Sequence, residues 1–183
     1  MAGKTTAKAT EDNSVLEDKT SDQKKKNKID IENLNLDEKV TVVNLAGWPV
    51  HFARINDIGD VTITPNGKQR LSRNEIQSQV NVNNILFTGT DGRGTHATVY
   101  IDDEATRYYV GFENEDSKQE IFTDELAKKL FGLSFEKFQE RLPKAIITRA
   151  EKYALSEAVK RLGINDYKKI VLTEKYTGYN IGI

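Results

Sequence analysis

The most regular alternation of apolar and polar positions in the chain lies between Asn84 and Phe112, NILFTGTDGRGTHATVYIDDEATRYYVGF. In its middle, Ala97, Val99 and Ile101 alternate with more polar residues, which is the period-two pattern of a half-buried β-strand. A glycine-rich loop precedes this segment and an acidic turn follows it, with further apolar residues beyond each. The pattern therefore predicts three consecutive antiparallel strands.

The acidic turn 102–105 predicts a hairpin between the second and third of these strands. In that register Ile101 faces Thr106 on the apolar face, whereas Tyr100 faces Arg107 on the mixed face and Tyr109 follows on the same side. Antiparallel sheets commonly leave one face in water. The mixed face is thus either ordinary sheet surface or a docking surface.

The chain before this segment shows shorter strand patterns separated by strong turn signals. Lys39–Leu45 predicts a strand with branched residues on both faces, and alternation recurs over 48–53 and 61–64. Pro65-Asn66-Gly67 is a turn signature, and Ser72 with Glu75 three residues later fits a capping box that opens a helix to about Val80. Short strands at this spacing predict a small antiparallel β-barrel or curled sheet of about six strands.

The chain after Glu113 changes to helical periodicity. Capping and stop signals predict helices over 126–131, 135–141 and from Pro143 to Leu162, and a strand-like segment over 169–183. A helix-turn-helix reading of 123–141 lacks a basic recognition face, because Glu136 and Glu140 share the second helix with its cations, so ordinary helix packing is favoured. Strands followed by helices indicate an α+β fold.

Composition divides the 183 residues into three parts. Hydrophobic residues make up only 37% of the chain, so part of it lies outside a core. The first 28 residues are nearly all small or polar, which predicts disorder, and the apolar positions of 29–36 are candidates for docking on the folded domain or on a partner. We expect a disordered arm over 1–36, a β-rich domain over 37–114 and a helical appendage over 115–183.

Charge and residue types exclude several classes of function. The net charge of −1 argues against whole-protein attraction to nucleic acid or membrane. A local run of lysines is a candidate nucleic-acid contact, although such runs are also typical of solvated linkers; it comprises Lys24, Lys25, Lys26 and Lys28. The absence of cysteine excludes disulfides, thiolate zinc sites and cysteine nucleophiles. Because no apolar run has the length of a signal sequence or membrane span, we expect a soluble intracellular protein.

No motif in the sequence predicts a catalytic centre. The loop Gly89–Thr95 has the form GxxGxG and precedes a predicted strand, whereas phosphate-binding glycine loops open a helix. It therefore reads as a hairpin loop with Arg93 at its tip. His51 and His96 are too few for a zinc site of three or four ligands, and no GxSxG elbow accompanies the serines. We expect no catalytic residue, no metal site and no cofactor.

Three stretches, TPNGKQRLSRNEI, ILFTGTDGRGTHATVYIDD and RYYVGF, resemble a group of small proteins encoded by tailed bacteriophages of Gram-positive bacteria. The resemblance spans about Val40 to Phe112. It implies a virion-associated or assembly protein, and it carries no catalytic residues. The polar N-terminal arm and the threonine- and asparagine-rich β segments agree with that class.

The sequence therefore predicts a non-enzymatic virion structural or assembly protein, present in the virion and in the host cytoplasm during assembly. It docks on capsid, connector or tail proteins through its β-domain and arm, with self-association as a further option. Since aromatic residues and arginine dominate interface anchors, the predicted contact residues are Trp48, Arg93, Tyr100, Arg107 and Tyr109. The alternatives are a nucleic-acid-binding module that uses the lysine run and a host-directed accessory protein; a membrane partner is not expected.

Overall fold

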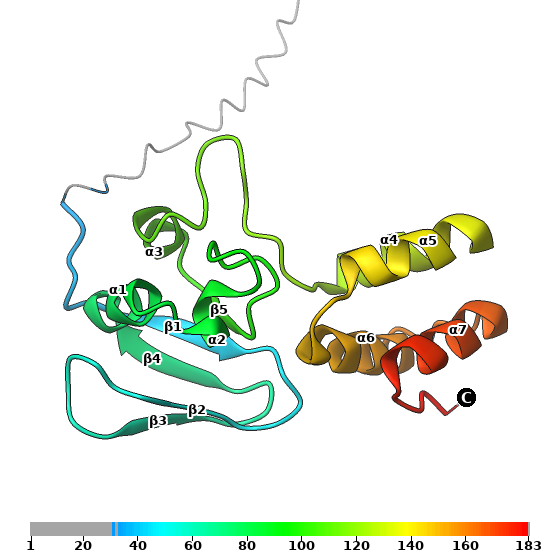
Figure 1. Ribbon diagram of the computed structural model, residues 1–183, viewed down its shortest axis with the longest axis horizontal. Coiled ribbons are helices and arrows are strands. Elements are labelled where there is room, and N and C mark those ends of the chain that lie inside the picture. The colour runs from blue at the N-terminus through cyan, green and yellow to red at the C-terminus, as the bar shows by residue number, and fades with distance from the viewer. Residues whose placement is uncertain (1–30, 32, 183) are drawn as a thin grey trace, which may run out of the picture.

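A computed structural model describes residue 31 and residues 33–182 (Figure 1). Most of the predicted disordered arm, residues 1–30 and 32 with the lysine run Lys24, Lys25, Lys26 and Lys28, lies outside the described residues. At its described end, the carbonyls of Asn35 and Leu36 accept hydrogen bonds from Arg73 and Asn74. In the described part, short strands and helices come first: β1 Lys39–Asn44, β2 Val50–Ala53, β3 Asp60–Ile63, β4 Lys68–Ser72, α1 Arg73–Asn81, α2 Ile85–Thr88, β5 Val99–Ile101 and α3 Glu104–Tyr109. The remaining elements are helical: α4 Asp124–Phe131, α5 Phe135–Ala145, α6 Arg149–Arg161 and α7 Tyr167–Thr177. The fold is α+β, as predicted.

The predicted strand at Lys39–Leu45 is confirmed as β1, the centre of a three-stranded antiparallel sheet of order β4-β1-β5. Val40 and Val42 are buried on one face of β1, which explains the need for branched apolar residues there. They pack against Leu71 of β4 and Ile101 of β5 in one hydrophobic cluster. β2 and β3 form a separate two-stranded antiparallel sheet whose buried side chains join the same cluster.

A fully buried amide connects these two sheets. The Asn44 side chain donates from Nδ2 to the carbonyl oxygens of Trp48, Ile63 and Thr64 at 2.8–3.2 Å, and its Oδ1 accepts from the Ala46 N–H. Buried backbone carbonyls need such partners. Asn44 therefore fixes the turns on either side of the hairpin, including the predicted turn at Pro65-Asn66-Gly67, where Asn66 has a φ of 52°.

The predicted β-barrel or curled sheet is wrong. The sheets have three and two strands and do not close, because the segments predicted to flank β5 as strands are the helices α2 and α3. Asn84 accepts a hydrogen bond from the Leu86 N–H, and Asp103 accepts one from the Thr106 N–H. These N-caps start helices where the alternation of apolar residues predicted strands. The expected pairing of Ile101 with Thr106 is therefore absent, and β5 pairs with β1 instead.

A buried arginine links the start of β1 to α1 and α3. The Arg73 side chain is 7% exposed and forms ion pairs with Glu38 and Asp103. Its Nε donates to the Thr106 hydroxyl at 3.0 Å, and its Nη1 donates to the Asn35 carbonyl at 3.0 Å. Burial of a charge is costly unless it is paired and hydrogen-bonded, so these partners are required for this packing.

The helical part confirms the short helices and corrects the longer one. α4 begins after the predicted cap Thr123 and ends at Gly132. α5 continues through Pro143 to Ala145, so the predicted start of the next helix at that proline is wrong. The capping box that opens α6 is Thr148 with Glu151, because reciprocal side-chain bonds satisfy two otherwise unpaired amides there.

The C-terminal segment predicted as strand-like is the helix α7. Asp166 caps its start and Gly178, with a φ of 78°, ends it. The β-branched and tyrosine residues of this segment favour strands locally, but burial of Ile170 against α5 and α6 overrides that preference. Phe138, Leu142 and Leu155 complete the centre of this second hydrophobic cluster, which contains no residue of the first.

Candidate functional site

One of the predicted contact residues, Trp48, lies at the boundary between two units of the chain. We call residues 37–112 the β-rich unit and residues 122–182 the helical unit. The Trp48 ring meets the Tyr153 ring edge-on, with centroids 6.2 Å apart, and the Arg149 guanidinium lies 4.8 Å above the indole. Tyr153 in turn contacts Tyr179 at 5.6 Å. Trp48 therefore joins the two units of this chain.

A histidine–carboxylate pair crosses the same boundary. His96 Nδ1 lies 2.5 Å from Glu151 Oε1, and the Glu151 carboxylate also accepts from the N–H groups of Ile147 and Thr148. His96 holds a φ of 59°, which is uncommon for a residue with a side chain. The other histidine, His51, is exposed on β2 and contacts Thr62, so the structure does not bring the two histidines together.

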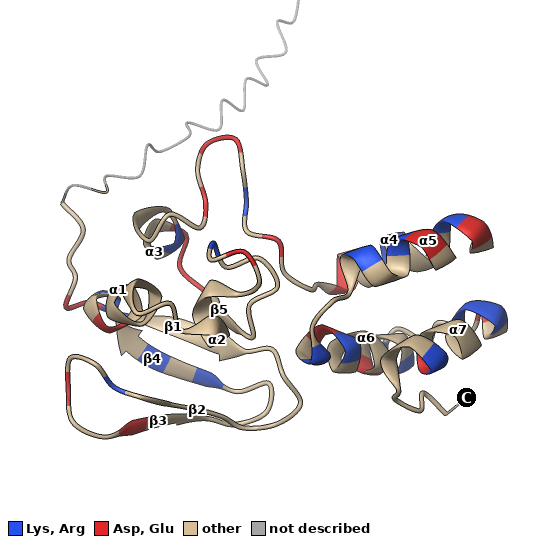
Figure 2. Cartoon of the chain, viewed as in Figure 1, with Lys and Arg blue, Asp and Glu red and all other residues tan. Residues whose placement is uncertain are grey.

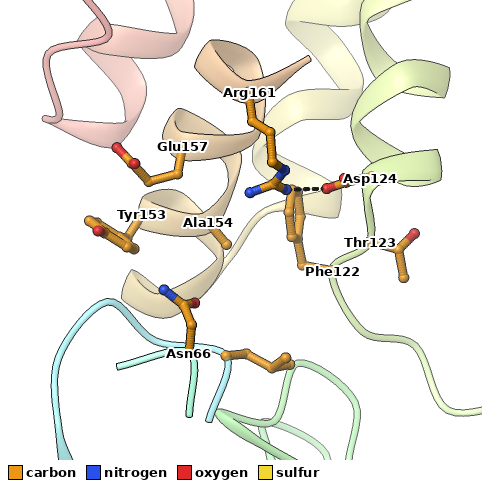
Figure 3. A pocket seen from close by; sticks show the side chains of 9 residues that line it. Asn66, Phe122, Thr123, Asp124, Tyr153, Ala154, Glu157 and Arg161 are labelled. Atoms are coloured by element: carbon orange, nitrogen blue, oxygen red, sulfur yellow. Dashed lines mark hydrogen bonds and ion pairs between the residues drawn. The ribbon is translucent and has the colours of Figure 1, made fainter. Parts of the chain in front are cut away.

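A cleft of about 260 Å³ opens beside this boundary (Figure 3). Arg161 of α6 extends across it to form an ion pair with Asp124 of α4, and Glu157 pairs with Lys160 at 3.0 Å. Its lining draws on both units: Leu45, Asn66, Phe122, Thr123, Asp124, Tyr153, Ala154, Glu157 and Arg161. Because its charges are already paired within the chain, the cleft shows no strong preference for a charged ligand.

The predicted neighbours Tyr100 and Arg107 do lie together, although α3 rather than a hairpin brings them there. The Arg107 guanidinium lies 5.1 Å from the centre of the Tyr100 ring, and its Nη1 donates to the Ile101 carbonyl at 2.7 Å. Its Nε lies 3.0 Å from Glu113 in an ion pair whose side chains are only 11% and 5% exposed. Burial also raises the pKa of the Tyr100 hydroxyl. Arg107 thus holds Tyr100 in place and has little surface left for a partner.

The other two predicted contact residues lie apart from this pair. Tyr109 is half-buried at the end of α3, and Arg93 is exposed in the glycine-rich loop. Inside that loop the Asp91 carboxylate accepts from the N–H groups of Arg93 and Thr95 at 2.8 and 3.2 Å. Burial by itself raises the pKa of the Asp91 carboxyl. Hydrogen bonds from Thr95 and Arg93 outweigh burial, so the pKa is lowered overall. These N–H groups therefore donate to a side chain of the loop itself and do not point toward a phosphate site.

The solvent-side face of the three-stranded sheet carries cations on β1 and β4 and an aromatic ring on β5. Directly paired residues of antiparallel strands project to the same face, and the register pairs Thr41 with Arg70 and Val43 with both Lys68 and Tyr100. We call this surface the outer sheet face; it consists of Lys39, Thr41, Val43, Lys68, Arg70 and Tyr100. Figure 2 shows the basic residues of β4.

The sequence does not predict this surface, because β4 has too little apolar pattern to be recognised as a strand. Lys68–Ser72, KQRLS, has a single large apolar residue, Leu71, which is almost fully buried. An edge strand with one solvated face needs no more than that. The signal available in the sequence was the asparagine–glycine turn directly before it, which also favours a strand on its far side.

The described residues provide neither a metal-binding cluster nor a membrane-spanning helix. Among the described residues, no cluster of three or more potential ligands is arranged to hold a metal ion. None of the described helices combines the length and apolar character needed to cross a membrane. The chain matches no protein-family model, no curated protein and no solved structure.

Proposed function

We propose that this protein is a non-enzymatic structural or assembly protein of a tailed bacteriophage, which docks on other particle proteins through the outer sheet face. The resemblance to phage proteins over residues 40–112 supports the class. The observation that supports the surface is that the exposed cations Lys39, Lys68 and Arg70 share one sheet face with the Tyr100 ring, which Arg107 holds in place.

This surface combines features of protein interfaces. Aromatic and arginine side chains are enriched at interface centres, where a rigid ring loses little entropy on binding. Tyr100 is already held by Arg107, so docking would not have to order it. Among the described residues, Lys39 and Arg70 form no ion pair, and Lys68 only approaches Asp102 at 4.0 Å. These charges favour a partner with an acidic surface.

The proposal is tested by quantitative mass spectrometry of purified particles, comparing the natural chain with the double variant Lys68→Glu and Arg70→Glu. We expect the natural chain in the particle and at least about a tenfold lower amount of the variant, because two attractions become repulsions. A matched control reverses the exposed Lys128 and Lys129 of α4 and keeps normal incorporation. Absence of the natural chain both from finished particles and from assembly intermediates would contradict the proposal.

A second candidate is single-stranded nucleic acid, because cations and an aromatic ring on one sheet face are also typical of such binders. Three phosphate contacts would make the logarithm of affinity fall with the logarithm of salt concentration with a slope of about −2. Fluorescence anisotropy with a labelled oligonucleotide measures this slope. Binding that does not depend on Lys68 and Arg70 would reject this candidate.

A further inference from the structure

One edge of β4 has no partner strand among the described residues. In the described part of the chain, β4 pairs only with β1 and is the last strand on its side of the sheet. Two backbone bonds fix which groups face β1: Arg73 N–H donates to Glu38, and Asn44 N–H donates to Gly67. Since hydrogen-bonded pairs alternate along an antiparallel ladder, Gln69 and Leu71 also face β1. The N–H and C=O groups of Lys68 and Arg70 therefore point outward.

A groove of about 300 Å³ runs beside this edge. One wall consists of residues 69–72 of β4, and the other includes Arg54, Asn56 and Asp57 from the turn after β2. This second wall is held rigidly, because the buried Glu75 carboxylate accepts from the N–H groups of Ile55 and Asn56 at 3.0 Å each. A pre-formed wall lowers the entropy cost of binding.

Glu75 shows how firmly this wall is built. Burial by itself raises the pKa of the Glu75 carboxyl, but hydrogen bonds from Asn56, Gln79 and Ile55 outweigh burial and lower the pKa overall. Asn56 Nδ2 also donates to the Asn74 carbonyl and the Ser78 hydroxyl at 3.0 and 2.8 Å. The turn thus stays attached to α1 while the β4 edge remains open beside it.

Charge indicates what kind of chain this edge accepts. The groove is lined by the cations Lys39, Arg54 and Arg70 and by the carboxylates of Asp37, Asp57 and the hydrogen-bonded Glu75. On the outer sheet face beside the edge, Lys39, Lys68 and Arg70 give an excess of positive charge. Cationic edge residues oppose pairing of β4 with a second copy of itself, because like charges would face each other. An acidic partner strand has no such penalty.

We propose that β4 accepts an extended acidic segment of a partner protein as an additional antiparallel strand, a proposal that deepens the docking function proposed above and rests on it. Main-chain hydrogen bonds to Lys68 and Arg70 would provide affinity, and alternate acidic side chains on the outer sheet face would provide selectivity. The register places those acidic side chains beside Lys68 and Arg70, with apolar side chains between them directed to the groove.

The first experiment measures amide hydrogen exchange by NMR on the full chain without a partner. The outward N–H of Arg70 exchanges at least about a hundredfold faster than the inward N–H groups of Gln69 and Leu71, because only the latter are in the ladder. Slow exchange at Arg70 in the free protein would overturn the proposal, since it would show that the edge is already occupied by this chain or by a second copy.

The second experiment uses two synthetic probes, the acidic peptide TEVEVET and its charge-reversed form TKVKVKT. The acidic peptide binds at least about tenfold more tightly and slows exchange at Arg70. The variant Arg70→Pro abolishes binding, because it removes the outward donor while leaving the inward ladder, and circular dichroism checks that it folds. Lys128→Glu on α4 is the matched control for charge and leaves binding unchanged. Equal binding of both peptides, or of the acidic peptide to Arg70→Pro, overturns the proposal.

These outcomes separate this inference from the function proposed above. Fast exchange at Arg70 and selective binding of the acidic peptide support the strand-accepting edge even if the chain is absent from particles. Presence in particles together with a protected Arg70 amide supports the particle role and rejects the edge.

Discussion

The β-rich unit and the helical unit differ in what holds them together. In the β-rich unit, buried polar side chains make the long-range connections: Asn44 joins the sheets, Glu75 holds a turn and Arg73 links three elements. The helical unit relies more on apolar packing around Phe138 and Leu155, and it has fewer such links: Lys169 and Tyr176 donate to the carbonyls of Phe131 and Ile146 at 2.7 and 2.6 Å. The difference reflects where unpaired backbone groups lie: the turns of the β-rich unit leave buried backbone groups that side chains must satisfy, whereas a helix satisfies all but its terminal groups internally.

The largest expected effect is the loss of stability when a buried ring is removed from one of the two hydrophobic clusters. Phe138→Ala should lower the stability of the helical unit by about 3–5 kcal/mol, because it removes a fully buried ring and leaves a cavity. Phe87→Ala should do the same in the β-rich unit, where Phe87 packs on Phe52 at 5.2 Å. Amide exchange at Leu155 and Val42 measures each unit separately. If either variant accelerated exchange equally at both residues, the clusters would form one cooperative unit.

The next largest effect is a pH-dependent loss of stability when a polar connection of the β-rich unit, that of Asp103 with Arg73, is removed. Burial raises the pKa of the Asp103 carboxyl, but hydrogen bonds from Thr106 and the charge of Arg73 outweigh burial, so the pKa is lowered overall. A carboxyl with a lowered folded-state pKa stabilises the fold above its unfolded pKa of about 4, and this stability is lost as the pH falls through the folded value.

Asp103→Asn keeps a good N-cap but removes the charge that faces Arg73. It should cost about 1.5–3 kcal/mol at pH 7, and the difference from the natural chain should shrink below about pH 4. Urea unfolding at several pH values measures it. The matched cap Asp166→Asn on α7 should cost less, because the Asp166 carboxylate is 42% exposed and its pairing with Lys169 is weakened by solvent. Equal losses in the two variants would remove this distinction between the units.

The smallest effect concerns the boundary between the units. A methyl group added at Gly47 would lie 2.0 Å from the Tyr153 ring, so Gly47→Ala should displace that ring from Trp48. The cost is about 1–2 kcal/mol, because overpacking is partly offset by the reduced freedom of the unfolded chain. Trp48 is the chain's single tryptophan, so its fluorescence reports the displacement. Gly132→Ala, whose nearest neighbours lie at 3.3 Å or more, is the control, and an unchanged spectrum in Gly47→Ala would show that the boundary is loosely packed.

Local signals predicted the fold where they did not compete with each other. The Thr123 cap and Gly132 placed α4, and the run of branched residues at Lys39–Leu45 placed β1. Where signals competed, the wrong one was chosen: Asn84 and Asp103 cap helices that apolar alternation had predicted as strands. Pro143 was read as a helix start although it lies inside α5.

The candidate surface was predicted only in part. The pairing of Tyr100 with Arg107 was expected, but Arg107 is used in a buried ion pair, and Trp48 joins the two units instead of facing a partner. Lys68 and Arg70 were missed because their strand carries little apolar pattern. Trp48, Arg93 and Tyr109 do not gather with Tyr100 in one site.

The sequence by itself determined the α+β class, the central strand β1, the helices with clear caps and the absence of cysteine chemistry, because these depend on residue types and on neighbours within one turn. Only the tertiary structure decided that β5 pairs with β1, that α7 is a helix and that β4 forms an exposed cationic edge. Those outcomes depend on residues far apart in the chain, such as Val43, Lys68 and Tyr100. Local preferences of a few tenths of a kcal/mol per residue are overridden by burial, which contributes about 1.5–3 kcal/mol for a single large apolar side chain.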